Sequence, residues 1–343
     1  MKGLKLIEPN KFIEEVADLE ENSAETFETD LSKVKITKAM ITTSDILRYK
    51  GEIDVNNVVL GSYGVGVVME TAQNMFGLEK GNHVYVEPYK SCNECYNCKN
   101  GEEWKCSNLL IAGEDYDGFL SDFVSVETSK LYLLPESVSD YEGIFIGHIS
   151  LALSIIVKLG IQKGDYVAVI GANNVGIILS ELLIYYQAVP ILISQYEENI
   201  EIAKKSGIYY TLSENDNWQK EVSSLTGGRM AKHVVYLAES NIPANKAFSL
   251  ASFNADVAIT GEGYKTSSIT FTQAIKKQLN IHCINASSGN TSASINILVN
   301  KAIDLSHLKL DCCNYSDAIS IFEQKNAEIE EIGYVCETVV DLI

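Results

Sequence analysis

The pattern of apolar and polar residues changes in character along the chain. From Lys2 to about Leu134, the two kinds alternate in short runs that glycines interrupt, as in KVKITKAMI and GNHVYVEPY. Alternation with a period of two is typical of half-buried strands, so this part predicts a β-rich, partly barrel-like unit. From Ser139 to Asn280, continuous apolar runs such as DYVAVIG and VPILIS alternate with longer helical stretches. This pattern predicts βαβ units around a parallel sheet, and hence an α/β fold.

The segment EENIEIAKKSG carries the signals of a helix and of its end. Lys204 and Lys205 lie in the last turn, where cations interact favourably with the helix dipole, and Gly207 follows just beyond. Past Asn280 the strand and helix signals mix, and we expect this part to return to the first unit. The predicted division is a β-rich domain over residues 1–145, a βαβ domain over 146–280 and a C-terminal segment over 281–343.

Composition restricts the class of protein. With 343 residues, 46% of them apolar and 21% charged, the chain is expected to form about two globular domains. No apolar run reaches the roughly 18 residues of a spanning helix, and MKGLKLIEPNKFIEE turns acidic too early for a secretory signal, so we expect a cytoplasmic protein. The 27 basic and 46 acidic residues give a net charge of −19, which repels nucleic acid and anionic membranes. We expect neither as a partner, and solubility alone accounts for the acidity.

Four of the eight cysteines fall within fifteen positions. Cys92, Cys95, Cys98 and Cys106 have the spacing C-x2-C-x2-C-x7-C. Such an array can hold four thiolates tetrahedrally around Zn2+, in a closed shell that leaves no position for substrate. The sequence therefore predicts a structural zinc site in a lobe over about residues 90–108. An iron–sulfur cluster is an alternative, although the fourth cysteine comes late and without the usual proline. Four free buried thiols are another.

The run VAVIGANNVG predicts a strand, a tight turn and a helix. Gly171 would form the turn, and Gly176 would let the helix pack closely on the sheet, as in dinucleotide-binding folds. Asn173 replaces the middle glycine of the usual fingerprint, and Asn174 and Val175 follow it. Asparagine tolerates a left-handed backbone, so the turn can persist, but its side chain occupies space that a diphosphate needs. A βαβ unit that no longer binds a nucleotide is therefore an alternative.

The end of the next predicted strand bears on the choice of cofactor. An acidic residue there would bind the ribose hydroxyls of NAD, but PILISQYEEN offers Ser194 and Gln195 instead. A serine can suit the 2′-phosphate of NADP when cations stand near, yet the nearest downstream lysines are Lys204 and Lys205. The sequence thus leaves NAD(H), NADP(H) and the absence of a cofactor open.

The order of these segments resembles the medium-chain dehydrogenase/reductase family, in particular its zinc-containing alcohol and polyol dehydrogenases. The resemblance covers nearly the whole chain. It is carried by ITTSDILRYKG, VLGSYGVGVVMETA, LEKGNHVYVEPYKSCNECYNCKNGEEWKC, DGFLSDFVSV, LPESVSDYEG, LGIQKGDYVAVIGANNVG and IEIAKKSG. It implies a GroES-like catalytic domain over residues 1–145 and a Rossmann domain with a doubly wound parallel sheet over 146–280. It also implies a cleft between them, a small-molecule substrate and a homodimer or homotetramer.

The resemblance further implies a second, catalytic zinc ion in the cleft, and the residues at its ligand positions depart from the family. These positions fall on Thr42, Ser62 and Gly147. The two alcohols stay protonated at neutral pH and glycine has no side chain, so none offers the anionic or imidazole donor that holds zinc tightly. We therefore expect this ion to be lost, together with the Lewis acid that serves alcohol oxidation.

A polar set stands at or beside these positions. It consists of Ser44, at the family's proton-relay serine, with Asp45, Tyr63 and His148. Tyr63 or His148 could protonate a carbonyl or enolate oxygen while a reduced nicotinamide delivers hydride. The alternative is that both side chains only fill the volume that the lost ligands vacated. A metal site rewired through Asp45, Tyr63, His148 and a late cysteine is a further alternative, although Asp45 belongs to the outer shell in the family.

Three functions are compatible with the sequence. The first is an oxidoreductase without catalytic zinc that reduces a small carbonyl or activated alkene with NAD(P)H. The second is a non-catalytic relative that keeps the fold and acts as an assembly or regulatory partner. The third is a zinc dehydrogenase with atypical ligands. We favour the first because Ser44, Asp45, Gly171 and Gly176 all persist.

Overall fold

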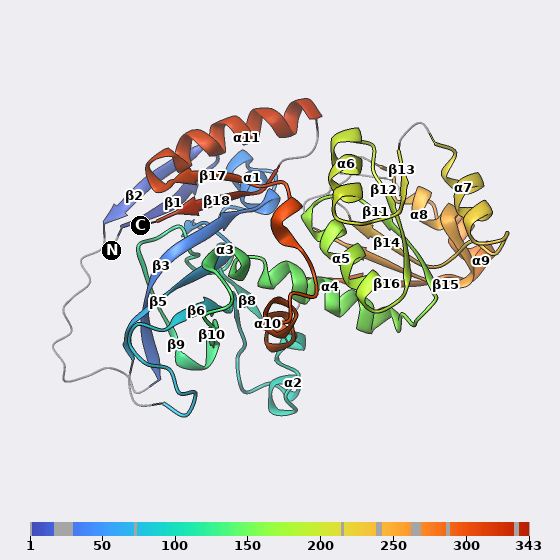
Figure 1. Cartoon of the computed structure of the whole chain (residues 1–343). Coiled ribbons are helices and arrows are strands. Elements are labelled where there is room, and N and C mark those ends of the chain that lie inside the picture. Colours follow the sequence, from blue (N-terminus) through green and yellow to red (C-terminus); the bar gives the residue numbers. More distant parts are fainter. Residues whose placement is uncertain are drawn as a thin grey trace. The chain divides into compact units, whose positions relative to one another are not determined.

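The computed structural model describes residues 2–16, 30–71, 74–213, 216–237, 242–261, 269–285, 289–332 and 336–342, and the chain divides into two units (Figure 1). The first unit comprises Met1–Ile146, Thr291–Val299 and Leu310–Ile343, and the second comprises Gly147–Asn290 and Asn300–Lys309. The predicted C-terminal segment is thus shared between the units. Its first part belongs to the second unit because strand β16 (Asn280–Ile284) pairs with β15 (Ala251–Thr260). The end residues Met1 and Ile343 of the predicted ranges, and Ala72 of a quoted motif, lie outside the described residues.

The first unit is β-rich, as the alternating pattern predicts. Its strands form a seven-stranded sheet, a three-stranded sheet and a two-stranded ladder. The strands are β1 (Lys2–Glu8), β2 (Lys11–Val16), β3 (Leu31–Ile41), β4 (Val58–Val59), β5 (Tyr63–Thr71), β6 (His83–Val86), β7 (Tyr89–Lys90), β8 (Leu110–Ile111), β9 (Phe123–Glu127), β10 (Leu131–Leu133), β17 (Asp311–Asn314) and β18 (Thr338–Asp341). The helices are α1 (Thr43–Lys50), α2 (Tyr96–Lys99), α3 (Asp140–Gly143), α10 (Thr291–Val299) and α11 (Ala318–Ile332).

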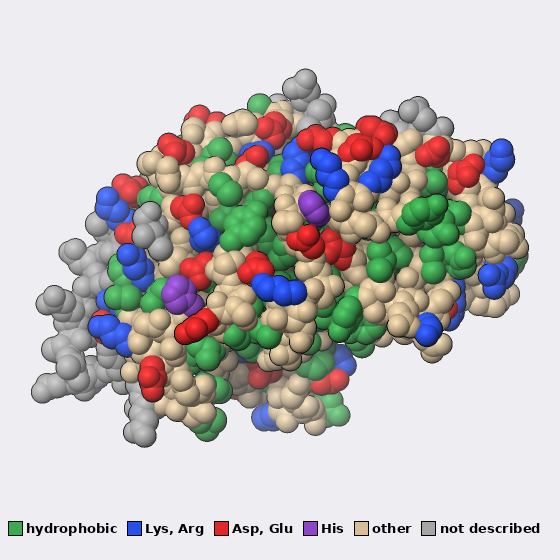
Figure 2. Space-filling model, viewed as in Figure 1, with side chains coloured by type: hydrophobic (Ala, Val, Ile, Leu, Met, Phe, Trp, Pro, Cys, Tyr) green, Lys and Arg blue, Asp and Glu red, His purple; other side chains and the backbone are tan. Residues whose placement is uncertain are grey.

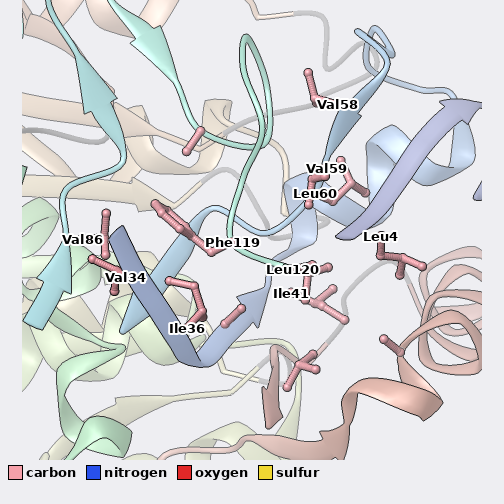
Figure 3. Packing of buried hydrophobic residues seen from close by; sticks show 14 of the residues in the cluster. Leu4, Val34, Ile36, Ile41, Val58, Val59, Leu60, Val86, Phe119 and Leu120 are labelled. Atoms are coloured by element: carbon pink, nitrogen blue, oxygen red, sulfur yellow. The ribbon is translucent and has the colours of Figure 1, made fainter. Parts of the chain in front are cut away.

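One apolar cluster holds the first unit together (Figure 3). Strand β3 contributes Val34 and Ile36, which are fully buried, whereas the alternate residues Lys33 and Lys35 are only partly buried. Phe119 packs in the same cluster and is likewise buried. Removing this apolar surface from water is the main term that stabilises the sheet, at about 25 cal/mol per Å2. The sheet therefore gives α1 and the turn before β5 a rigid base.

The second unit is a doubly wound parallel sheet. Its strand order is β13-β12-β11-β14-β15-β16, with every neighbouring pair parallel, which is the order of the dinucleotide-binding fold. The remaining strands are β11 (Tyr166–Ile170), β12 (Val189–Ile193), β13 (Tyr210–Leu212) and β14 (Ala231–Leu237). The helices are α4 (Ile146–Leu159), α5 (Asn174–Tyr185), α6 (Glu197–Lys205), α7 (Trp218–Leu225), α8 (Asn245–Leu250) and α9 (Thr272–Lys277). The α/β fold predicted from the sequence is confirmed.

Helices cover both faces of this sheet. Val222, Phe248 and Ala274, from α7, α8 and α9, pack on one face in a common apolar cluster. Helix α5 packs on β11 and β12 without joining that cluster, so it covers the opposite face. The predicted helix end is confirmed, because α6 ends at Lys205 and Gly207 adopts a left-handed φ of 79°. The carboxyl ends of the strands, where this fold binds ligands, are thereby fixed in place.

Acidic and basic side chains are interspersed on the face of the molecule shown in Figure 2. The net charge of −19 is therefore not gathered into a single acidic patch on that face. None of the helices within the described ranges has both the length and the apolar character needed to traverse a lipid bilayer.

Candidate functional site

The four cysteines of the array meet in one lobe of the first unit. All four sulfur atoms lie within 4.8 Å of one another, with 3.4 Å between Cys95 and Cys98 and 3.9 Å between Cys92 and Cys98. Four sulfurs at about 2.3 Å from one zinc ion would stand about 3.8 Å apart. The spacing therefore fits a tetrahedral site, which Cys106 completes. In the part of the chain that the structure describes, no other group of His, Cys, Asp and Glu side chains is gathered so closely.

Backbone amides favour thiolates in this lobe. The sulfur of Cys106 accepts hydrogen bonds from the N–H groups of Cys92 and Asn108, each at 3.3 Å. The bond from Cys92 is the main reason why the pKa of the Cys106 thiol is lowered. The N–H of Cys98 likewise lowers the pKa of Cys95 to about 6. Because a metal binds the thiolate form, these amides prepare Cys95 and Cys106 for an ion, whereas burial and the neighbouring sulfurs raise the pKa of Cys98 to about 12.

The lobe is anchored to the sheet at its base. Strands β7 and β8 pair as an antiparallel ladder that brings the two ends of the lobe together. Inside the lobe, the Glu103 carboxylate accepts hydrogen bonds from the Ser91 hydroxyl at 3.1 Å and the Lys130 ammonium at 2.8 Å. Lys130 follows β9, outside the lobe, so this ion pair ties the lobe to the core of the unit.

A buried carboxylate joins the start of α1 to the turn before β5. One oxygen of Asp45 accepts from the N–H and the hydroxyl of Thr42, both at 2.8 Å, which forms a capping box at the start of α1. The other oxygen accepts from the N–H of Gly61 at 3.0 Å. Burial raises the pKa of Asp45, although these donors and the charge of Arg48 act in the opposite direction. Both oxygens of Asp45 are thus engaged by the protein itself.

The other predicted catalytic residues lie in different settings. Ser44 is half-buried on α1, and Tyr63 begins β5, where it pairs with Met40 of β3. The structure thus places Ser44, Asp45 and Tyr63 in the first unit. His148 is 3% exposed on α4 and belongs to the second unit, so its association with the other three stays a prediction.

The predicted strand, turn and helix of the dinucleotide fingerprint are present. Gly171 has a φ of 112°, which favours glycine, and its N–H donates to the carbonyl of Ile193 at 2.9 Å. Gly176 lies in the first turn of α5, and a Cβ atom at this position would stand 2.0 Å from the carbonyl oxygen of Gly171. Only glycine therefore lets the helix approach the end of the strand so closely.

The two asparagines of the turn both make protein contacts. Asn173 is the N-cap of α5, and its side-chain oxygen accepts from the N–H of Gly176 at 2.9 Å. With a φ of −74°, its backbone is extended and not left-handed, so the tolerance of asparagine for a left-handed backbone plays no part here. The side-chain oxygen that caps the helix is what this position requires. The side-chain amide of Asn174 donates to the carbonyl of Lys309 at 2.9 Å. Val175, next in the helix, is buried.

At the carboxyl end of β12, uncharged residues occupy the position of the ribose-binding acid. Ser194 is buried, and its hydroxyl oxygen accepts from the N–H of Tyr196 at 3.1 Å. Gln195 donates from its amide to the hydroxyl of Tyr196 at 2.6 Å. The first turn of α6 then carries Glu198, whose carboxylate lies 2.9 Å from the ammonium of Lys309. Glu198 and Lys309 thus form an ion pair with each other.

Sequence reasoning missed a buried acid on α5. Glu181 accepts a hydrogen bond from the N–H of Asp304 at 2.8 Å, and burial raises its pKa to about 7. The available signal was a single acid inside the apolar run IILSELLIY. Together with the contact between Asn174 and Lys309, this bond holds residues 300–309 against α5.

A second set of polar side chains lies across neighbouring strands of the parallel sheet. His233 on β14 is buried between two acids, with 3.1 Å from Nε2 to Asp165 and 3.8 Å from Nδ1 to Asp256. His282 on β16 lies 3.0 Å from the same Asp256. Burial nevertheless lowers the pKa of His233, because its effect exceeds that of the two acids. The group is a structural network at the amino half of the strands, away from the turn.

Two family models match the chain. The alcohol dehydrogenase GroES-like domain matches residues 29–136, and the zinc-binding dehydrogenase domain matches residues 174–300. Together they cover more than half of the 343 residues. With the two-unit fold and the closely spaced cysteines, these matches define the class: the chain belongs to the medium-chain dehydrogenase/reductase family of oxidoreductases.

Individual relatives agree with this assignment. An uncharacterized zinc-type alcohol dehydrogenase-like protein of Haemophilus influenzae is 27% identical over 83% of this chain and 84% of its own length. The starvation-sensing protein RspB of Escherichia coli is 24% identical over 94% of this chain and 96% of its own. A crystal structure of a short chain alcohol dehydrogenase (rspB) from Escherichia coli, complexed with NADH, has a TM-score of 0.84 and 22% identity, covering 100% of this chain and 99% of that one. Because so few residues are identical, the similarity to this structure shows a shared fold only.

Proposed function

We propose that this chain is an NAD(P)H-dependent oxidoreductase that reduces a small carbonyl or activated alkene without a zinc ion at the family's catalytic position. One observation carries the proposal. Asp45 binds both Thr42 and Gly61, next to Ser62, so the two first-unit segments that hold zinc ligands in the family are here joined by hydrogen bonds. Thr42 uses its hydroxyl in that bond, and an alcohol is a poor zinc ligand at neutral pH.

The four cysteines would hold one structural zinc ion. The sulfur spacing and the N–H bonds to Cys106 support this assignment over four free thiols. An iron–sulfur cluster uses the same donors, and metal analysis of the purified protein separates the two. Zinc at one equivalent per chain supports the proposal, whereas iron with inorganic sulfide contradicts it.

The nicotinamide cofactor would lie at the turn before α5. NADH is present in the crystal of the Escherichia coli relative, and the glycine geometry of Gly171 and Gly176 is compatible with the same use here. When bound, the reduced nicotinamide supplies a hydride, and the chain must supply the proton that the product requires. Tyr63 and His148 are the proposed donors and Ser44 the proposed relay. Asp45 would act by position, since both of its oxygens are bonded.

A second candidate function is a non-catalytic homologue that acts as an assembly or regulatory partner. It is favoured by the capping of α5 by Asn173 and by the uncharged Ser194, both of which reduce the affinity expected for a dinucleotide. Titration with NADH and NADPH, followed by fluorescence and by the melting temperature, discriminates the two. Binding of either compound supports the oxidoreductase, and no response to either at millimolar concentration contradicts it.

Substitution tests the proton donor once a substrate is found. Tyr63→Phe and His148→Ala remove the two candidate groups separately. A loss of turnover of about 100-fold or more in one variant, with cofactor affinity kept, would identify the donor. Unchanged turnover in both variants would remove these residues from the mechanism.

A further inference from the structure

The helix that should receive the cofactor's phosphates already has an acceptor of its own. The first N–H groups of a helix have no partner inside the helix, and they are the groups that bind phosphate in dinucleotide folds. In this chain the side-chain oxygen of Asn173 accepts from the N–H of Gly176 at 2.9 Å. Asn173 is 8% exposed, so water competes little for this bond. One of the N–H groups at the start of α5 is therefore occupied from within.

The rest of the turn cannot easily move aside. Gly171 is held by its hydrogen bond to Ile193, and Gly176 has no room even for a Cβ atom. The side-chain amide of Asn174 is bound to the carbonyl of Lys309. The backbone of the turn is thus held by its own contacts, and the bond that an incoming diphosphate would have to replace at Gly176 is the one from the Asn173 side chain.

We propose that Asn173 sets the affinity of this chain for dinucleotides, because its side chain caps α5 in the free protein and must leave the N–H of Gly176 before the diphosphate binds. This inference rests on the proposed function, in which the turn receives NAD(H) or NADP(H). The Asn173 side chain would compete with the diphosphate for the N–H of Gly176, whereas the glycine of the usual fingerprint has no side chain that could do so. The cap and the ligand exclude each other at one donor, so removing the cap must strengthen binding.

The direct test replaces the cap by the residue of the fingerprint. Asn173→Gly should lower the Kd for NADH about twofold, the factor that corresponds to the few tenths of a kcal/mol by which asparagine exceeds glycine as an N-cap residue. ADP, which keeps the diphosphate, should gain by the same factor, whereas adenosine, which lacks it, should bind unchanged. The melting temperature should change little, because glycine is itself tolerated at an N-cap.

A charged variant and a matched control accompany it. Asn173→Asp keeps the capping oxygen and adds a negative charge, so it should retain the melting temperature and raise the Kd for ADP at least fivefold. Asn217 caps α7 by the same kind of bond, from the N–H of Lys220 at 3.2 Å. Asn217→Gly removes a cap away from the glycine turn and should leave every Kd unchanged.

Hydrogen exchange gives a readout without any ligand. The amide of Gly176 should exchange more slowly in the wild-type protein than in Asn173→Gly, since the cap is the bond that protects it. Two results would overturn the inference and leave the proposed function standing. One is equal exchange of the Gly176 amide in the wild-type protein and in Asn173→Gly. The other is a Kd for NADH that is unchanged or higher in Asn173→Gly while the wild-type protein binds NADH. Binding by Asn173→Gly alone would support the inference about the cap and contradict the proposed function of the wild-type chain. Failure of both proteins to bind NADH, NADPH and ADP would overturn the proposed function and the inference together.

Discussion

The buried carboxylate of Asp45 provides the sharpest prediction about the first unit. The substitution Asp45→Ala removes the acceptor for the N–H of Thr42 and for the N–H of Gly61, which lie 2.8 and 3.0 Å from its oxygens. Asp45 is 1% exposed, so water does not replace it in the intact fold. The variant therefore leaves two N–H groups without their acceptor where the start of α1 meets the turn before β5.

The magnitude follows from the number of donors. A buried donor without a partner costs about 1–3 kcal/mol, so the two N–H groups together cost about 2–6 kcal/mol. Removing a carboxylate whose pKa is raised by burial returns part of this free energy. We expect a net loss of about 2–4 kcal/mol. In a unit of this size that corresponds to a fall of roughly 5–15 °C in the melting temperature.

Thermal unfolding of the wild-type protein and two variants tests this reasoning. Glu142→Ala is the matched control, because Glu142 forms the same kind of capping box, with Ser139 N–H at 2.9 Å, on the exposed start of α3. There water can replace the carboxylate, so we expect a loss of about 1 kcal/mol or less. If Asp45→Ala melts no lower than Glu142→Ala, then Asp45 does not hold the two segments together.

Three further predictions concern pH and metal. Burial lowers the folded-state pKa of His233 below its usual value, so the unfolded chain binds more protons than the folded one. The free energy of unfolding should therefore fall as the pH drops below about 6.5. His233→Gln should flatten this pH dependence, as measured by urea titrations. The pKa of Glu181 is raised to about 7, so ionisation of its carboxyl group destabilises the fold. Glu181→Gln should therefore stabilise the protein by about 2 kcal/mol at pH 8 and leave its stability unchanged at pH 4. Equal effects at the two pH values would contradict this cause. Chelation or Cys98→Ser should speed hydrogen exchange within residues 90–108 alone, and uniform exchange across the chain would argue against a local metal site.

Local features of the fold were accessible from the sequence. The end of α6 at Lys205 and the left-handed Gly207 follow from residues that are neighbours in the chain, as does the strand, turn and helix around Gly171. Each of these depends on backbone preferences and on caps within one or two turns. The cysteine spacing likewise confines the four sulfurs to one lobe.

Contacts between distant residues were not accessible in this way. Asp45 and Gly61 are 16 positions apart, and Glu181 and Asp304 are 123 apart, so no short pattern pairs them. Both bonds depend on how the sheets bring loops together. The role of Asn173 as an N-cap was also not accessible, because it depends on the residue at which α5 begins. Sequence patterns place such boundaries only to within a few residues.

The number and place of bound zinc ions decide whether this chain has kept only a structural zinc site. Anomalous X-ray scattering at the zinc edge, from crystals of zinc-saturated protein, should show one strong peak per chain, equidistant from the sulfurs of Cys92, Cys95, Cys98 and Cys106. A second peak of full occupancy beside Thr42 and Ser62 would show that a catalytic zinc ion is present, and with it the Lewis acid that a zinc-free mechanism lacks.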